Sequence, residues 1–218
     1  NFHVRQRLWS RTGHLQFQVT DPYIWWPRGK GDQHLYEVEM RLYHKGEVVD
    51  TKTFKTGIRT AQLDRSSVTD ENGTGEFCFL VNHKKLFILG TNWVPLDSLP
   101  SRGKKRIADA LALVEDIGCN MIRCWGGGYY EYDEFYEICD EKGILVWQDF
   151  MMGGGQYPQG DWFLEKIYTE AVSVIKRLRQ HPCLVLWSGD NECDEIAKFT
   201  HYPNYNPNHN KITRHVIR

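Results

Sequence analysis

The hydrophobic pattern of this chain changes its period near Leu86, and this change constrains the fold more than any other feature. Before it, apolar and polar residues alternate, as over residues 15–19, which is typical of strands with one buried face. After it, short apolar runs alternate with longer amphipathic stretches. The pattern therefore predicts an antiparallel β domain over residues 1–84 and a β/α domain over residues 85–218.

The first part shows the features of a β-sandwich. Alternation returns over residues 36–42, and turn dipeptides stand at Lys45-Gly46 and Asn72-Gly73. Short strands with turns between them predict an immunoglobulin-like β-sandwich that ends near Asn82. The chain starts without Met or the apolar core of a signal peptide, so we expect residues upstream of Asn1 to complete the sandwich.

The second part contains four continuous apolar runs, as expected of parallel strands that are buried on both faces. The runs are Leu86 to Leu89, Met121 to Cys124, Ile144 to Trp147 and Leu184 to Trp187. Strand, helix and strand in repetition predict parallel units with right-handed crossovers. Eight such strands close a barrel and four do not. We therefore expect the first half of a (β/α)8 TIM barrel, with the rest beyond Arg218.

The stretches between the runs predict three helices with one apolar face each. The expected buried residues are Ile107, Leu111, Val114 and Ile117 in the first helix, Phe135 and Ile138 in the second, and Leu164, Ile167, Ala171, Val174, Ile175 and Leu178 in the third. Gly118 and Gly143 are placed to end the first two helices. Asp161 is expected as the N-cap of the third, which Pro182 stops.

The carboxyl end of each apolar run, here called its exit, contains a Trp and a polar group. The four exits read Gly90-Thr91-Asn92-Trp93, Arg123-Cys124-Trp125-Gly126-Gly127-Gly128-Tyr129, Trp147-Gln148-Asp149-Phe150 and Trp187-Ser188-Gly189-Asp190-Asn191-Glu192. A TIM barrel carries its catalytic groups at the carboxyl ends of its strands, and flat aromatic faces suit sugars. The exits therefore predict a carbohydrate pocket with Glu192 as the first catalytic candidate. The alternative for Glu192 is an exposed carboxylate at the start of a helix.

Several segments resemble a known family. The stretches NMIRCWGGGYYE, GILVWQDFM and LVLWSGDNE are similar to segments of glycoside hydrolase family 2, and the WGGG and WQDFM pair resembles its β-mannosidase branch. WWPRGKGDQHLYEVEMRL and KTGIRT resemble the sandwich domain of that family. The resemblance implies a retaining, exo-acting glycosidase that removes terminal β-mannose from oligosaccharides or glycoconjugates.

The resemblance also implies roles for the residues at the fourth exit. Glu192 would be the general acid/base, and Asn191 would hydrogen-bond the 2-hydroxyl of the sugar. A retaining mechanism needs a second carboxylate as nucleophile. In this family it comes from strand seven, which we expect beyond Arg218. Asp190 is predicted to be a structural hydrogen-bonding group.

The other exits would supply the remainder of the pocket. Arg123 would hold the nucleophile ionised, and its alternative is an ion pair inside the barrel. Trp125 would form a wall of the subsite for the non-reducing mannose. Asn92, Trp93 and Asp149 would line the same pocket. The Gly-rich stretch over residues 152–156 has no role that the resemblance assigns.

Other functions stay open or are disfavoured by the composition. The alternatives are another family 2 activity, such as β-glucosaminidase or endo-β-mannosidase, and a non-catalytic carbohydrate-binding remnant.

The composition indicates no other class of partner. A net charge of −1 with interspersed signs indicates neither a nucleic-acid groove nor a membrane patch. Nine scattered His and six Cys without C-x-x-C spacing suggest no metal site, and no cofactor is expected. The Cys are expected as free thiols. No apolar stretch reaches transmembrane length. The sequence indicates no oligomeric state and no compartment, which would be lysosomal in a eukaryote and cytoplasmic or periplasmic in a bacterium.

Overall fold

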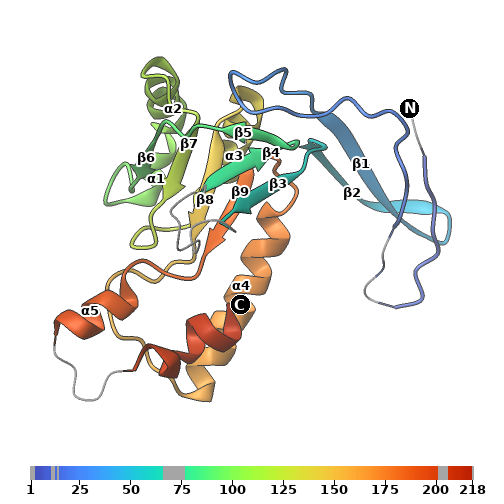
Figure 1. The fold of residues 1–218 in the computed structure, drawn as a ribbon. Helices are drawn as coiled ribbons and strands as arrows, with labels where there is room; N and C mark the ends of the chain where they lie inside the picture. The colour runs from blue at the N-terminus through green and yellow to red at the C-terminus, as the bar shows by residue number, and fades with distance from the viewer. Residues whose placement is uncertain (1–2, 11–12, 14, 66–76, 201–205, 218) are drawn as a thin grey trace.

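The chain folds into two antiparallel sheets followed by one parallel sheet (Figure 1). The computed structural model describes residues 3–10, 13, 15–65, 77–200 and 206–217. Strands β1 (Tyr36–His44) and β2 (Glu47–Thr56) form a ribbon, and β3 (Ala61–Asp64), β4 (Cys78–Val81) and β5 (Lys84–Leu86) form a three-stranded sheet. The parallel sheet has the order β6 (Gly90–Trp93), β7 (Met121–Cys124), β8 (Leu145–Asp149) and β9 (Leu184–Ser188). An antiparallel β domain followed by a partial barrel is the predicted fold class, which is confirmed.

Helices connect the parallel strands on one side of the sheet. They are α1 (Pro100–Lys104), α2 (Ile107–Asp116), α3 (Asp133–Lys142) and α4 (Asp161–Leu178). After β9 the chain continues through α5 (Cys193–Phe199), the 3₁₀ turn η1 (Pro207–His209) and the π-helical turn η2 (Ile212–Val216). Figure 1 shows α4 extending from the sheet to the C-terminal segment, where η2 lies beside it.

The ribbon confirms one sequence expectation and corrects another. Lys45 and Gly46 connect β1 to β2 with φ values of 50° and 93°, as a tight hairpin turn requires. Residues 15–19, which were expected to form a strand, lie outside every strand and are exposed. Alternation makes a strand only where a neighbour supplies the ladder of hydrogen bonds, and residues 15–19 belong to none of the described sheets. The turn expected at Asn72-Gly73 lies outside the described residues.

The first parallel strand begins later than the sequence predicts. Asn82 and His83, at φ values of 49° and 62°, form the turn of a hairpin in which β5 pairs with β4. Leu86 therefore ends the antiparallel sheet, while Phe87 and Leu89 are exposed. The predicted division between residues 84 and 85 falls inside β5 and stays a prediction. The turn lacks Gly, so the pattern did not reveal it.

The predicted helix faces agree with the structure except near the helix ends. Ile117 is 69% exposed because α2 ends at Asp116, before Gly118 at φ 80°. Gly143 caps α3 with a left-handed φ of 69°, as predicted. The N-cap of α4 is Gly160, so Asp161 lies in the first turn instead, where its charge favours the helix dipole. In α4, Ile175 is also exposed.

The β domain is attached to the amino ends of the parallel strands. Trp25 is fully buried, and its indole N–H donates to the backbone carbonyl of Asp140 at 2.8 Å. The Asp140 carboxylate accepts the backbone N–H of Cys183 at 2.9 Å and lies 2.6 Å from Nδ1 of His181. The hydroxyl of Thr56 donates to the carbonyl of Gln180 at 2.6 Å. A closed hydrogen-bonded cluster therefore joins the two parts.

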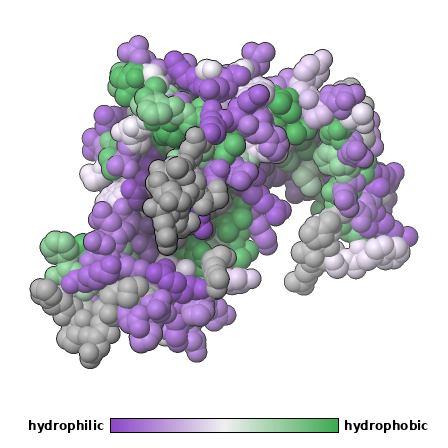
Figure 2. Space-filling model, viewed as in Figure 1, coloured by the Kyte–Doolittle hydropathy of each residue, from purple (hydrophilic) through white to green (hydrophobic). Residues whose placement is uncertain are grey.

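The surface of the described residues combines a polar lobe with apolar areas. Figure 2 shows that the lobe formed by α5 and the C-terminal segment is mostly hydrophilic, whereas hydrophobic side chains gather near α2 and on the β1–β2 ribbon. The exposed apolar residues in these areas include Leu113 and Ile117 near α2, and Met40 and Leu42 on the ribbon. Among the described helices, none is long and apolar enough to cross a membrane.

Candidate active site

Arg123 is the centre of a polar cluster at the carboxyl ends of the parallel strands. It lies on β7, paired with Asn92 of β6, so both side chains leave the same face of the sheet. Its Nη2 donates to Asp149 Oδ2 at 2.6 Å and to Asn191 Oδ1 at 2.9 Å. Its Nε donates to Asp149 Oδ1 at 3.3 Å, and its Nη1 to Asn92 Oδ1 at 3.4 Å. Four of the predicted site residues are therefore brought together.

Only the carboxylate partner of the ion pair in this cluster is fully buried. The Asp149 side chain is 0% exposed and the Arg123 side chain is 25% exposed. Burial raises the pKa of the Asp149 carboxyl, while Arg123 and the N–H of Gly126, at 3.1 Å, oppose this shift. The guanidinium carbon also lies 5.2 Å from the centre of the Trp147 ring. Arg123 therefore forms the interior ion pair that the sequence offered as the alternative, and it still reaches solvent.

The turn after β9 places Asn191 and Glu192 differently. Asn191 is buried, its N–H donates to the Met152 carbonyl at 2.8 Å, and its own carbonyl accepts the N–H of Gly154 at 2.7 Å. Glu192 is exposed and has a left-handed φ of 58° at the start of α5. Its carboxylate makes no bond to any described residue. Left-handed backbone is uncommon outside Gly, and such strain concentrates at functional sites.

Trp125 begins the Gly-rich loop that follows β7. Its side chain is half-buried, and a Cβ on Gly127 would stand 2.1 Å from the indole ring. The ring therefore lies against Gly127, and a larger residue at position 127 would require the ring to move. The N–H of Gly128 donates to the Trp125 carbonyl at 3.1 Å and closes the turn.

Trp93 does not join the cluster, contrary to the sequence expectation. It is 6% exposed, its indole N–H donates to Glu131 Oε1 at 2.9 Å, and its ring lies 4.8 Å from that of Phe135. Successive side chains of a strand point to opposite faces, so Trp93 points into the core while Asn92 faces Arg123.

Glu131 is a residue that sequence reasoning missed. It is buried at 2% exposure, and burial raises the pKa of its carboxyl. Its backbone carbonyl accepts a bond from Arg177 of α4 at 2.9 Å. Nothing in the spacing of the aromatic stretch around Glu131 distinguishes it from the exposed acids nearby. Its role in the structure is to link the end of β6 to α4.

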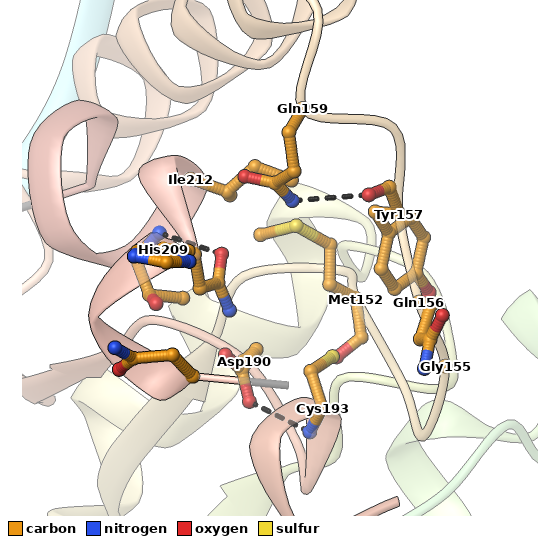
Figure 3. Close-up of a pocket in the computed structure, with 12 residues that line it drawn as sticks. Met152, Gly155, Gln156, Tyr157, Gln159, Asp190, Cys193, His209 and Ile212 are labelled. Carbon is orange, nitrogen blue, oxygen red and sulfur yellow. Dashed lines mark hydrogen bonds between the residues drawn. The ribbon is translucent and has the colours of Figure 1, made fainter. Parts of the chain in front are cut away.

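A cavity of about 190 Å³ lies beside the cluster rather than within it. Figure 3 shows Met152, Tyr157 and Gln159 of the loop after β8 facing Asp190, Cys193 and the C-terminal segment. Asp190 Oδ1 accepts the N–H of Cys193 at 3.1 Å, which fits the structural role predicted for Asp190. Neither Arg123 nor Glu192 lines this cavity. The described residues contain no group of three or more His, Cys, Asp or Glu that could hold a metal ion.

The fold and the strand-end cluster define a class of protein, and comparison with protein families agrees. Residues 3–59 match the model described as glycosyl hydrolases family 2, and residues 74–216 match the TIM barrel domain of the same family. The chain belongs to glycosyl hydrolase family 2.

Its relatives within that family include β-mannosidases. The chain is 44% identical over 185 residues to β-mannosidase B of Aspergillus clavatus and 41% identical over 179 residues to that of Thermothelomyces thermophilus. These matches cover 84% and 82% of this chain but only 22% and 21% of the two relatives. The chain therefore spans about a fifth of the length of the curated relatives that it matches.

Solved structures give the same picture. The β-D-mannosidase of Dictyoglomus thermophilum is similar with a TM-score of 0.71 and 43% identity over 80% of this chain and 21% of that chain. An exo-chitosanase of Amycolatopsis orientalis is similar with a TM-score of 0.62 and 26% identity over 78% of this chain and 20% of that chain.

Proposed function

We propose that this chain is part of a retaining, exo-acting β-mannosidase that removes terminal β-mannose from oligosaccharides or glycoconjugates. The observation that carries the proposal is the bonding of Arg123 to both Asp149 and Asn191, directly beside the exposed Glu192. The identity of 41–44% to named β-mannosidases over most of the chain supports the choice of sugar.

Glu192 is the general acid/base in this proposal. Its carboxylic acid protonates the glycosidic oxygen as the bond to C1 breaks, and its carboxylate later takes a proton from the water that hydrolyses the glycosyl-enzyme. Exposure at the rim of the sheet and the absence of a described partner leave the carboxyl free to reach a substrate oxygen.

Arg123 and Asn191 bind and orient in this proposal. Two bonds to the buried Asp149 fix the guanidinium, so its exposed side can hold the nucleophilic carboxylate that we expect from strand seven. Asn191 would donate its amide N–H to the sugar 2-hydroxyl, because its Oδ1 already accepts from Arg123. Trp125 would form a wall of the mannose subsite, and Asn92 would line it.

The test is hydrolysis by the full-length protein that contains this chain. We expect turnover of 4-nitrophenyl β-mannoside with release of the β-anomer first, as followed by NMR. The 218-residue chain alone should show no turnover, because it lacks the strand-seven carboxylate. Steady turnover by this chain as a monodisperse sample would contradict the proposal and would implicate Asp149 or Asp190 as the second carboxylate.

The second candidate is a β-glucosaminidase, which the likeness to the Amycolatopsis exo-chitosanase favours at lower identity. The matching 4-nitrophenyl β-glucosaminide separates the two activities. A higher kcat/KM on the glucosaminide than on the mannoside would replace the proposed substrate while leaving the mechanism in place. Binding of either sugar without any turnover by the full-length protein would favour a carbohydrate-binding remnant.

A further inference from the structure

Gly153 lies where two strand-end loops touch backbone to backbone. A Cβ built on it would stand 2.7 Å from Cα and 3.0 Å from N of Gly127, in the loop after β7. These atoms belong to the backbone and cannot rotate away as a flexible side chain can. The φ of Gly153 is not among the positive values of this chain, so the position requires Gly for space and not for conformation.

The other side of Gly153 faces the turn that carries the proposed acid. Gly153 forms an isolated parallel bridge with Asn191. Two hydrogen bonds make this bridge, from Asn191 N–H to the Met152 carbonyl at 2.8 Å and from Gly154 N–H to the Asn191 carbonyl at 2.7 Å. Gly153 therefore separates Gly127 from Asn191, and Glu192 follows directly.

Further contacts hold this arrangement in place. The hydroxyl of Tyr157 accepts the N–H of Gly153 at 3.0 Å and donates to its carbonyl at 3.2 Å. The Trp125 ring lies close to Gly127 as well. A displacement of Gly153 would therefore move the Trp125 loop, the Asn191 turn or both.

We infer that Gly153 is a positioning residue that sets Asn191 and Glu192 at their distance from the loop of Trp125. The inference gives a role to the Gly-rich stretch over residues 152–156. It rests on the proposed function in taking Glu192 as the general acid. A methyl group at position 153 needs several tenths of an ångström or more of backbone movement, and small misplacements of catalytic groups are costly.

Gly155 offers a matched control in the same loop. A Cβ on Gly155 would meet the Gly153 carbonyl oxygen at 3.6 Å and Tyr157 Cε2 at 3.8 Å, which are ordinary contacts. Its φ is not in the left-handed region. Gly153→Ala and Gly155→Ala therefore make the same chemical change, and only the first one pushes on the bridge.

The experiment compares two β-mannosides in the full-length protein, a methyl glycoside whose leaving group needs protonation and a 2,4-dinitrophenyl glycoside whose leaving group does not. For Gly153→Ala we expect kcat/KM to fall about 100-fold on the methyl glycoside and about 5-fold or less on the activated one. For Gly155→Ala we expect changes within about 2-fold on both. The ratio of the two substrates does not depend on the folded fraction. Equal losses on both substrates, or equal effects of the two variants, would overturn the inference.

Two further measurements test the inference without the kinetics of Gly153→Ala. The first uses a variant that adds no bulk, and the second needs no sugar to be turned over. Tyr157→Phe removes the hydroxyl that holds Gly153 without adding bulk, and it should shift the substrate ratio in the same direction by a smaller factor. Crystal structures of the two Ala variants should show Glu192 displaced relative to Arg123 only in Gly153→Ala. An unmoved Glu192 in Gly153→Ala would overturn the inference. A displaced Glu192, in a protein whose wild type prefers a sugar other than mannose, would uphold the inference and overturn only the proposed function.

Discussion

The two ends of the parallel sheet each hold a buried aspartate in different surroundings. At the carboxyl end, Asp149 is paired with Arg123, which keeps 25% of its side chain exposed. At the amino end, Asp140 contacts His181, whose side chain is 4% exposed, and the indole of Trp25 in the β domain donates to the backbone carbonyl of Asp140. One cluster is open to solvent and the other is closed.

Under the proposed function, this difference separates a cluster that binds a ligand from one that holds the fold together. In the amino-end cluster, both oxygens of Asp140 contact protein groups, the N–H of Cys183 and the ring of His181. In the carboxyl-end cluster, the bond from Arg123 to Asn92 is long, at 3.4 Å, and under the proposed function it would be exchanged for a bond to substrate. Barrels of this kind place chemistry at the carboxyl ends of strands and stability at the amino ends.

The sharpest test of the comparison is Glu192→Gln in the full-length protein. We expect kcat on a methyl β-mannoside to fall about 10²-fold to 10⁴-fold, because the general acid is lost. Turnover of the 2,4-dinitrophenyl glycoside should change far less, and the melting temperature should stay unchanged. Glu195→Gln, an exposed acid of the same helix, is the control. Equal losses on the two substrates would remove Glu192 from the role of acid.

The amino-end cluster should respond in stability instead. Asp140→Ala leaves buried partners unsatisfied, including the Cys183 N–H, and should lower the free energy of unfolding by about 3 kcal/mol. Substrate preference of the remaining folded enzyme should not change. Lys55→Ala removes an exposed salt bridge with Glu141 in the same interface and should cost less than about 1 kcal/mol. Urea unfolding of both variants measures the difference. Similar costs would show that the buried cluster does not dominate the interface.

A smaller effect is expected at the rim of the open cluster. Trp125→Ala should raise KM for a mannoside about 10-fold by removing an apolar face from the sugar, with little change in melting temperature because the ring is only half-buried. Inhibitor titration and thermal melting are the measurements. A large drop in melting temperature with unchanged affinity would make Trp125 a structural residue.

The smallest effect concerns Glu131, a buried acid at the carboxyl end of the sheet. Burial raises the pKa of its carboxyl above the ordinary 4.5, so the folded state holds the proton more firmly than the unfolded state. Ionisation therefore destabilises the fold as pH rises through this range. Glu131→Gln keeps an acceptor for Trp93 and should raise the melting temperature slightly at pH 7 and less at pH 4.5. A larger gain at the lower pH would contradict the sign of the shift.

Much of the fold followed from local periodicity. Three of the four apolar runs became parallel strands within two residues of the predicted bounds, because continuous hydrophobicity marks a strand that is covered on both faces. The parallel strand predicted from Leu86 to Leu89 was wrong, because the Asn82-His83 turn has left-handed backbone without Gly and gave no sign of the hairpin. The strand predicted over residues 15–19 was wrong because a strand needs a neighbouring strand, which the local pattern does not specify.

The site was predictable to the level of strand ends and no further. The sequence alone placed Asn92, Arg123, Asp149 and Asn191 at or just after the carboxyl ends of strands, because polar residues at the end of apolar runs mark the edge of a sheet. Only the tertiary structure decided which of them meet. Register pairs Arg123 with Asn92 and Trp147, and Asp149 lies two residues further along the same face. Trp93, one residue from Asn92, points to the opposite face and into the core, since register and alternation, which depend on neighbouring strands, decide where each side chain points.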